Sequence, residues 1–188
     1  MDPRYRPPVS LLAGAGLRIG EALGLKWRYV NMTDQFVAVD GALIPAYSLA
    51  VVQTYSRRAW GAPKTPRSRR MVPLSSAAWV ALTEMRERDL TGGGDDPVFR
   101  GSTGEPVDAH NVAARFLKKA GKTIGCPWVH WHCFRHTAAS LSEMDMAARQ
   151  KFLGHTSPAL RDCVDTRRPC RHRDGLQMRY GRKSLSPA

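Results

Sequence analysis

The sequence predicts an α+β fold, mostly α-helical with a small antiparallel β-sheet. Apolar residues recur at helical spacing in several stretches, and two short apolar runs, "FVAV" and "MVPL", have the character of strands. The chain of 188 residues is long enough for one domain with a hydrophobic core. These signals alternate without internal repeats, so we expect a single domain followed by a tail.

The first helix is predicted from "LRIGEALGLKW", whose apolar side chains recur at i, i+3 and i+4. It opens near Leu17, and Arg18 lies in its first turn. The two predicted strands fall between residues 35 and 74, and "PKTPRSRR" between them is expected to be an exposed basic turn. Residues 76–90 form the next helix, which ends in the loop "TGGGDDP".

Further helices are expected in the second half of the chain. Asp108 is a suitable N-cap, because its short carboxylate can accept hydrogen bonds from the first backbone N–H groups of a helix. The apolar positions after it keep helical spacing: Val112, Ala113, Phe116, Leu117 and Ala120. The pattern continues through residues 134–141, and residues 147–153 form a short helix that Gly154 ends.

The charge of the chain indicates an anionic partner. Lys and Arg number 29 against 16 Asp and Glu, a formal net charge of +13, which favours nucleic acid or an anionic membrane surface. No apolar run approaches the roughly 20 residues needed to span a bilayer, so nucleic acid is the stronger alternative. Residues 161–183 hold eight Lys or Arg against three Asp and show little apolar periodicity, which predicts a mobile basic tail over residues 159–188.

The cysteines and the N-terminus bear on the compartment. Four cysteines, at positions 126, 133, 163 and 170, show neither CxxC spacing nor a metal-finger pattern, so we expect reduced thiols and no metal site. A site built from Cys163, Cys170 and His172 is the alternative, but scattered cysteines in a basic tail are more often only that. The stretch "VSLLAGAGL" loosely resembles a secretory signal, but Asp2, the Pro7–Pro8 pair and the lack of a convincing cleavage site argue against one. We therefore expect a cytoplasmic protein.

Five basic residues form a set that suits a phosphodiester: Arg18, Lys64, His132, Arg135 and His155. Guanidinium groups hold non-bridging phosphate oxygens bidentately and stabilise the charge that grows in the transition state. A lysine or histidine can protonate a leaving oxygen or accept a proton from an attacking hydroxyl. Spacing alone is a weak argument, because 29 basic residues generate many such sets; Arg18 as a solvated helix-start residue or His132 as a packed core residue is the simpler alternative.

Four segments, in order, resemble the signature segments of the tyrosine recombinase (phage integrase) family: "GAGLRIGEALGLKW", "PKTPRSRRMVPL", "HCFRHTAASL" and "KFLGHTSP". The resemblance covers roughly residues 9–158. It implies a mostly helical catalytic domain with a small sheet, which breaks and rejoins DNA through a 3′-phosphotyrosyl link without a metal or a high-energy cofactor. It also implies double-stranded DNA as the partner and, on that DNA, other recombinase protomers.

The resemblance assigns a role to each of the five basic residues. Arg18 would be the first phosphate-clamping arginine, and Lys64 the general acid for the 5′-hydroxyl leaving group. His132 and Arg135 match the H-x-x-R pair of the family, in which the histidine assists proton transfer and the arginine is the second clamp. His155 matches a residue that hydrogen-bonds the scissile phosphate. The two histidines outside this pattern, at positions 130 and 136, receive no catalytic role.

The nucleophilic tyrosine of the family follows the "LGH" histidine by about nine or ten residues. Those positions hold Val164 and Asp165, and Tyr180 is the only tyrosine after them. Two interpretations remain open. Either Tyr180 is the nucleophile, reaching its own site or a neighbouring protomer through a long tail, or the C-terminal end is degenerate and the chain binds DNA without cutting it.

The domain organisation expected from the resemblance is a catalytic domain over residues 1–158 and the basic tail over residues 159–188. Family members carry an N-terminal DNA-binding domain, and nothing before Val9 could form one. We therefore expect weak affinity and weak choice of site. Two functions remain: a DNA strand-exchange domain, or a non-enzymatic basic DNA-binding module. An RNA-binding protein would fit the charge but would leave the four ordered segments unexplained.

Overall fold

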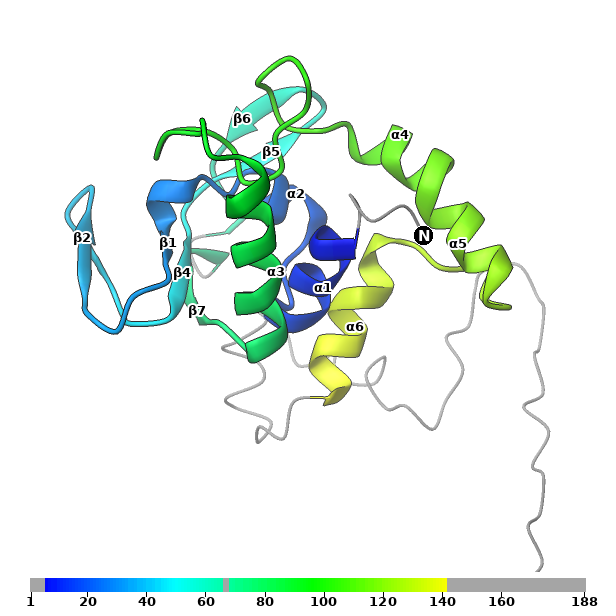
Figure 1. The fold of residues 1–188 in the computed structure, drawn as a ribbon, viewed down its shortest axis with the longest axis horizontal. Coiled ribbons are helices and arrows are strands. Elements are labelled where there is room, and N and C mark those ends of the chain that lie inside the picture. Colours follow the sequence, from blue (N-terminus) through cyan, green and yellow to red (C-terminus); the bar gives the residue numbers. More distant parts are fainter. Residues whose placement is uncertain (1–5, 66–67, 142–188) are drawn as a thin grey trace, which may run out of the picture.

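The structure is a computed structural model that describes residues 6–65 and 68–141. The helical elements in chain order are α1 (Arg6–Ala15), α2 (Ile19–Leu23), the 3₁₀ turn η2 (Trp27–Tyr29), α3 (Ser76–Arg88), α4 (Ala109–Val112), the π-helical η4 (Ala113–Leu117), α5 (Lys118–Thr123) and α6 (Trp131–Leu141). The strands are β1 (Val30–Asn31), β2 (Val37–Val39), β3 (Ala42–Ile44), β4 (Ser48–Val51), β5 (Thr54–Ser56), β6 (Ala59–Gly61) and β7 (Arg70–Pro73). Figure 1 shows helices around α1 with the strands gathered on one side, which confirms the predicted class.

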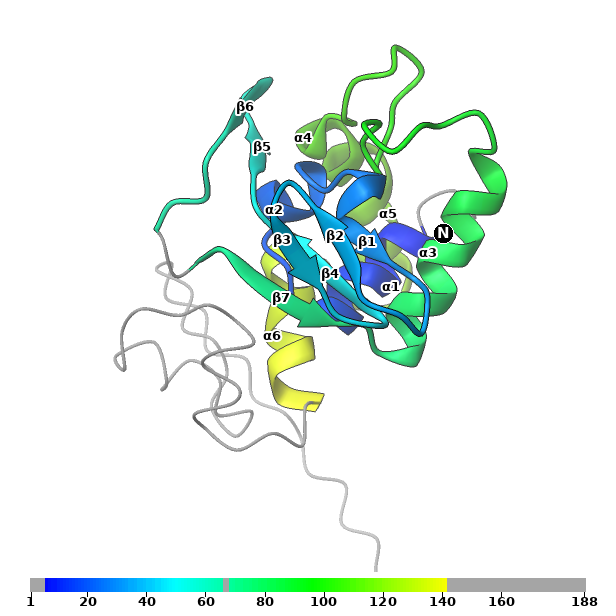
Figure 2. The same cartoon turned by 90° about the vertical axis from the view of Figure 1, so that its left-hand side faces the viewer.

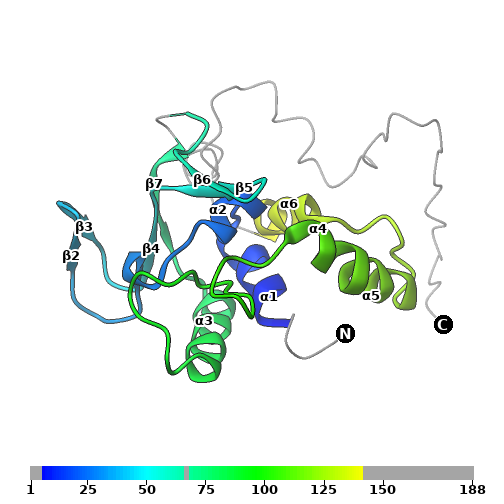
Figure 3. The ribbon, with the colours of Figure 1, turned by 90° about the horizontal axis from the view of Figure 1, so that it is seen from above.

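Helix α1 is the central element of the core. Leu11 and Leu12 are fully buried, and α3 and α6 both pack against α1 (Figures 1 and 3). Pro7 and Pro8 occupy its first turn, where backbone N–H groups have no intrahelical acceptor, so the two prolines start the helix at no cost in hydrogen bonds. The helix ends at Gly16, whose φ of +60° is a conformation that glycine adopts without strain.

The strands form three antiparallel sheets in the described residues. The largest has the order β1–β4–β7, with Leu49 of β4 opposite Val72 of β7, and both side chains fully buried. As predicted, both runs are in strands: "FVAV" contains β2, and "MVPL" overlaps β7. They belong to different sheets, whereas one small sheet was expected. The other two sheets are the hairpins β2–β3 and β5–β6 (Figure 2).

Helix α2 packs directly on strand β5. Gly24 caps the C-terminus of α2, and a Cβ atom at this position would lie 2.6 Å from Cα of Thr54. Only glycine permits this approach between the two backbones. In Figures 1 and 3, α2 consequently lies between the β5–β6 hairpin and α6.

The last helices follow the predicted pattern. The carboxylate of Asp108 accepts hydrogen bonds from the backbone N–H groups of His110 (2.9 Å) and Asn111 (3.0 Å), which confirms the predicted N-cap. The indole N–H of Trp131 donates to the carbonyl of Ala109 (3.0 Å) and joins the start of α6 to the start of α4. None of the helices in the described ranges combines the length and the apolar character that a membrane-spanning helix requires.

Candidate functional site

A buried carboxylate, Glu21 of α2, lies where three elements meet. Its side chain is 2% exposed and is surrounded by arginines from α2, β7 and α6. A carboxylate in such a place requires compensating charge, because burial of an unpaired ion is costly. The three guanidinium groups supply that charge, and the arrangement defines the arginine cluster: Arg18, Arg70 and Arg135.

Arg18 occupies the N-cap position of α2, one residue before the first turn in which it was expected. Its backbone N–H donates to Oε2 of Glu21 (2.9 Å), and its Nη1 donates to Oε1 (2.7 Å). The carboxylate three residues into the helix thus satisfies an N–H group at the helix start, as in one half of a capping box. The side chain of Arg18 is 39% exposed, so its guanidinium reaches the surface while one edge is held by Glu21.

Arg135 is the most deeply placed member of the arginine cluster. Its side chain is 3% exposed, and Nη1 lies 3.9 Å from Oε2 of Glu21. The same Nη1 donates to the carbonyl of Gly16 (2.5 Å), the residue that ends α1. Gly16 and Arg135 are 119 positions apart in the chain, so only the packing of α6 on α1 brings them together.

Arg70 was not singled out from the sequence, although it lies in the quoted segment "PKTPRSRRMVPL". Its Nη2 and Nη1 contact Oε2 (3.0 Å) and Oε1 (3.2 Å) of Glu21, a bidentate pair in which the Arg70 side chain is 6% exposed. Glu21 was also missed. The signal that could have found it is a single acidic residue three positions after Arg18, inside an otherwise apolar and glycine-rich helix.

The pKa values reflect this geometry. Burial by itself would raise the pKa of Glu21, but hydrogen bonds and charge from Arg70, together with the hydrogen bonds from Arg18, lower it below its usual value. Desolvation, followed by the charge of Arg18, lowers the pKa of Arg135 to about 9. Glu21 and Arg135 are therefore both charged at neutral pH. Three guanidinium groups against one carboxylate give the cluster a net charge of +2.

His132 lies on α6 next to the arginine cluster. Its ring meets the ring of His136 edge to face, with centroids 4.6 Å apart and planes at 88°. Partial desolvation, then the charges of His136 and Arg135 and more distant cations, lower the pKa of His132 to about 4. At neutral pH the exposed imidazole of His132 is therefore uncharged and can accept a proton or a hydrogen bond.

The remaining predicted residues lie elsewhere. Lys64 is exposed on the connection between β6 and β7, as expected for a basic turn, and within the described ranges no hydrogen bond or ion pair joins it to the arginine cluster. His155 and Tyr180 lie outside the described residues. The structure thus brings together Arg18, His132 and Arg135 and leaves Lys64 on a neighbouring loop.

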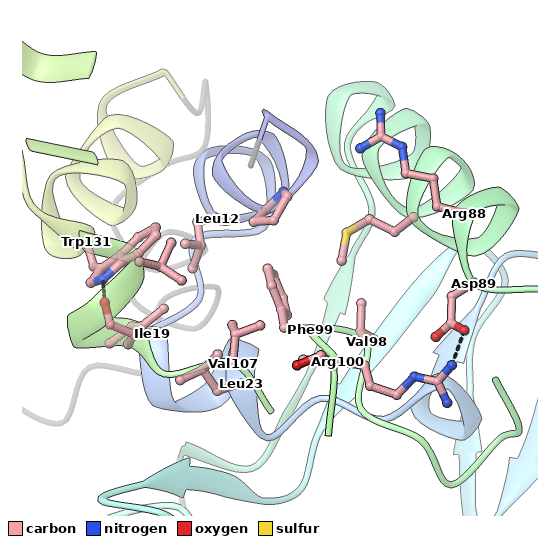
Figure 4. A pocket seen from close by; sticks show the side chains of 16 residues that line it. Leu12, Ile19, Leu23, Arg88, Asp89, Val98, Phe99, Arg100, Val107 and Trp131 are labelled. Atoms are coloured by element: carbon pink, nitrogen blue, oxygen red, sulfur yellow. Dashed lines mark hydrogen bonds and ion pairs between the residues drawn. The ribbon is translucent and has the colours of Figure 1, made fainter. Parts of the chain in front are cut away.

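A cavity of about 540 Å³ lies behind the helices that carry Arg18 and His132. Figure 4 shows its mostly apolar lining, with an ion pair between Asp89 and Arg100 at one end. Ile19 and Trp131, the neighbours of Arg18 and His132 in the sequence, contribute to the wall. In the described part of the chain, no three His, Cys, Asp or Glu side chains lie close enough to share a metal ion. The arginine cluster and the neutral imidazole of His132 could therefore bind an anion.

Comparison with known proteins agrees with this chemistry. The model of the phage integrase family matches residues 2–160. A tyrosine recombinase XerC of Xylella fastidiosa (strain M23) is 32% identical over 155 residues, which are 81% of this chain and 45% of the relative. A XerC of Yersinia pestis is 29% identical over 163 residues, with 82% and 45% covered. The chain thus spans less than half the length of these relatives.

Solved structures share the fold. The Tn1549 transposon integrase in complex with transposon right end DNA superposes with a TM-score of 0.67 at 19% identity, over 86% of this chain and 54% of the integrase. The XerA recombinase gives a TM-score of 0.63 at 23% identity, over 87% of this chain and 52% of that one. At these identities the likeness establishes the fold.

Proposed function

Because this chain belongs to the phage integrase family, we propose that it is a DNA strand-exchange domain that acts through a 3′-phosphotyrosyl intermediate. The observation that carries the proposal is the convergence of Arg18, His132 and Arg135 on one partly exposed site of net positive charge. Segments more than 100 positions apart supply these side chains. Such a site suits a phosphodiester, whose charge increases in the transition state.

Each side chain has a distinct task in this proposal. The guanidinium groups of Arg18 and Arg135 hold the non-bridging oxygens of the scissile phosphate. His132, neutral at physiological pH, accepts the proton of the attacking hydroxyl as its oxygen bonds to phosphorus and the 5′-oxygen leaves. Lys64, on the loop that leads into β7, protonates the 5′-hydroxyl leaving group, and His155 hydrogen-bonds the phosphate.

The partner in this proposal is double-stranded DNA, on which several protomers assemble. Support comes from the net charge of +13 and from relatives that are named recombinases or were solved in complex with DNA. Association with DNA through phosphate contacts is strongly salt-dependent. The same proposal includes the cytoplasmic location expected from the sequence.

A second candidate function rests on one specific observation: Val164 and Asp165 stand where the family has its tyrosine. In that case the arginines bind DNA, and the covalent step is absent. Loss of a nucleophile in a comparable covalent mechanism lowers the rate by about a millionfold. The first function, by contrast, requires Tyr180 as the nucleophile, because it is the only tyrosine in the sequence that follows His155.

The deciding experiment is covalent trapping. The purified chain is incubated with nicked double-stranded suicide substrates that carry several candidate core sites, and protein–DNA adducts are sought on denaturing gels. The proposal predicts an adduct that disappears in Tyr180→Phe and persists in Tyr47→Phe, a control that changes an exposed tyrosine elsewhere. Salt-sensitive DNA binding without any adduct across these sites would favour the second function.

Arg135→Ala separates the two functions in a second way. In a strand-exchange enzyme this change removes a transition-state contact, and adduct formation should fall below detection. In a passive binder it should reduce the slope of log K against log salt by only about 0.9. Circular dichroism of the variant provides the folding control, because Arg135 also hydrogen-bonds the carbonyl of Gly16.

A further inference from the structure

Arg70 contacts both Glu21, at the centre of the arginine cluster, and the connection that carries Lys64. Through Glu21 it contacts α2, the helix that Arg18 caps. Its Nη1 also donates to the carbonyl of Ser68 (3.1 Å), near the end of the connection that carries Lys64. On that connection the hydroxyl groups of Thr65 and Ser68 lie 3.0 Å apart.

Arg70 lies on β7, a strand whose position is fixed by pairing with the buried strand β4. In the antiparallel pair of β4 and β7, Arg70 lies opposite Val51, which is 3% exposed. A side chain placed by a paired, buried strand is held more precisely than one on a loop. The guanidinium of Arg70, 6% exposed, therefore contacts Glu21 from a strand that is held in place by its pairing with β4.

Glu21 would compete with any bound phosphate if Arg70 were absent. A carboxylate and a phosphate offer guanidinium groups the same kind of charged, bidentate acceptor. Arg70 contacts both oxygens of Glu21, whereas Arg18 donates one side-chain hydrogen bond and Arg135 lies 3.9 Å away. With Arg70 the cluster carries a net charge of +2, and without it the same groups would carry +1.

We propose that Arg70 is a positioning residue, which neutralises and fixes Glu21 so that Arg18 and Arg135 present their remaining charge to a phosphate group of the substrate. This inference rests on the proposed function, because it takes a phosphodiester as the ligand. It adds a residue that does not touch the reacting atoms and that acts through a buried carboxylate.

The test uses the full chain, with inorganic phosphate as the probe. The side-chain Nε–Hε signals of Arg18 and Arg135 are followed by NMR during phosphate titration. Arg70→Gln should weaken phosphate binding by about tenfold or more, because the net charge of the cluster falls from +2 to +1 and Glu21 is left to compete for Arg18 and Arg135. The matched control, Arg88→Gln, removes one positive charge from a half-exposed position on α3 and should change affinity by less than about twofold.

The double variant Arg70→Gln/Glu21→Gln makes the test specific. It removes both members of the buried pair and returns the net charge to +2, so phosphate affinity should recover to within about threefold of the original chain. If Arg70 had only a structural role, the double variant would bind phosphate as weakly as Arg70→Gln, because it loses the same contacts. If the double variant binds as weakly as Arg70→Gln, or if Arg70→Gln binds as tightly as the original chain, the inference is overturned.

The test also covers a folding failure of Arg70→Gln and the absence of a response to phosphate. Should Arg70→Gln fail to fold, Arg70→Lys takes its place beside the double variant. Both keep the net charge at +2, so both must bind phosphate within about threefold of the original chain, and a loss of about tenfold in either overturns the inference. If the signals of Arg18 and Arg135 in the original chain do not respond to phosphate, the phosphate site of the proposed function fails as well. Response in the original chain with unchanged affinity in Arg70→Gln refutes the inference alone.

Discussion

At the scale of single residues, Glu21 organises the site. One buried carboxylate orders three guanidinium groups that would otherwise repel one another, and it does so from the N-terminal turn of α2. Removing one partner of such a buried pair typically costs about 3–5 kcal/mol, because the other charge is left uncompensated. Replacement of both partners is better tolerated, because it leaves no unpaired charge in the buried site.

The titration of His132 is the first prediction at this scale. Its pKa of about 4 lies below the usual 6.5, so the unfolded chain takes up a proton before the folded one does. The contribution of His132 to stability is therefore complete above pH 6.5 and is lost as the pH falls from 6.5 toward 4.

Carbon–proton NMR should show the ring of His132 neutral at pH 6, with His132→Gln identifying its signal. Saturating phosphate should raise the pKa, because an anion favours the imidazolium. A midpoint above 6.5 without phosphate would contradict the geometry.

At the scale of elements, the turn of the β5–β6 hairpin is under backbone strain. Arg57 and Arg58, its two central residues, have φ of +52° and +60°. Two-residue hairpin turns of this kind favour Asn-Gly or Asp-Gly, and the β2–β3 hairpin indeed uses Asp40 and Gly41. Both side chains are exposed, so under the proposed function their charge is available to DNA phosphates.

Arg57→Asn/Arg58→Gly tests this interpretation. The variant should gain about 1 kcal/mol in the free energy of unfolding, since the left-handed conformation is easier for the new residues. It should bind DNA less tightly, and the slope of log K against log salt should fall by up to about 1.8 if both arginines contact phosphates. Chemical denaturation and salt titration provide the two measurements. A less stable variant would refute the strain, and unchanged binding would refute the DNA contact.

The contact between α2 and β5 gives a second prediction at this scale. A methyl group at Gly24 would lie 2.6 Å from Cα of Thr54, an atom of the backbone that cannot move aside alone. Gly24→Ala should therefore lower the free energy of unfolding by about 1–3 kcal/mol. Gly61→Ala is the matched control, because its methyl group would meet only the hydroxyl of Thr54 at 3.9 Å. Equal melting temperatures for the two variants would contradict the close approach.

At the scale of the whole molecule, the distribution of charge should govern DNA binding. The chain carries +13, and residues 161–183 contribute +5 of it. All of the remaining excess, +8, lies in the proposed catalytic domain, residues 1–158. Non-specific affinity for DNA depends on the number of phosphates neutralised, whichever segment supplies the charge.

Neutralising part of the tail measures its share. Changing the arginines at 167, 168, 171 and 173 to glutamine should reduce the salt slope by up to about 3.6 and leave the melting temperature of the domain unchanged. Fluorescence anisotropy with a double-stranded oligonucleotide, repeated at several salt concentrations, gives the slope. An unaltered slope would show that the tail does not contact DNA, and a lower melting temperature would show that it belongs to the folded domain.

The sequence predicted some elements and missed others: the first helix was expected to open near Leu17, which matches α2, and α1 was not predicted. Helix α3, the Asp108 N-cap and the helical pattern before Leu141 agree with the structure. Strands β1, β3, β4, β5 and β6 were not anticipated, because two to four residues carry too little periodicity to be recognised. The turn at Asp40 and Gly41 was a usable signal for one of the two hairpins.

What the sequence determined by itself was the class of fold and the residue types of the site. Helical periodicity is local, and the basic motifs could be read in order along the chain. Only the tertiary structure decided which groups the arginines contact. Packing of α6 on α1 brings Arg135 to Gly16, and pairing of β7 with β4 directs Arg70 to Glu21. Contacts between distant segments depend on how apolar faces pack, and no local pattern in the chain encodes them.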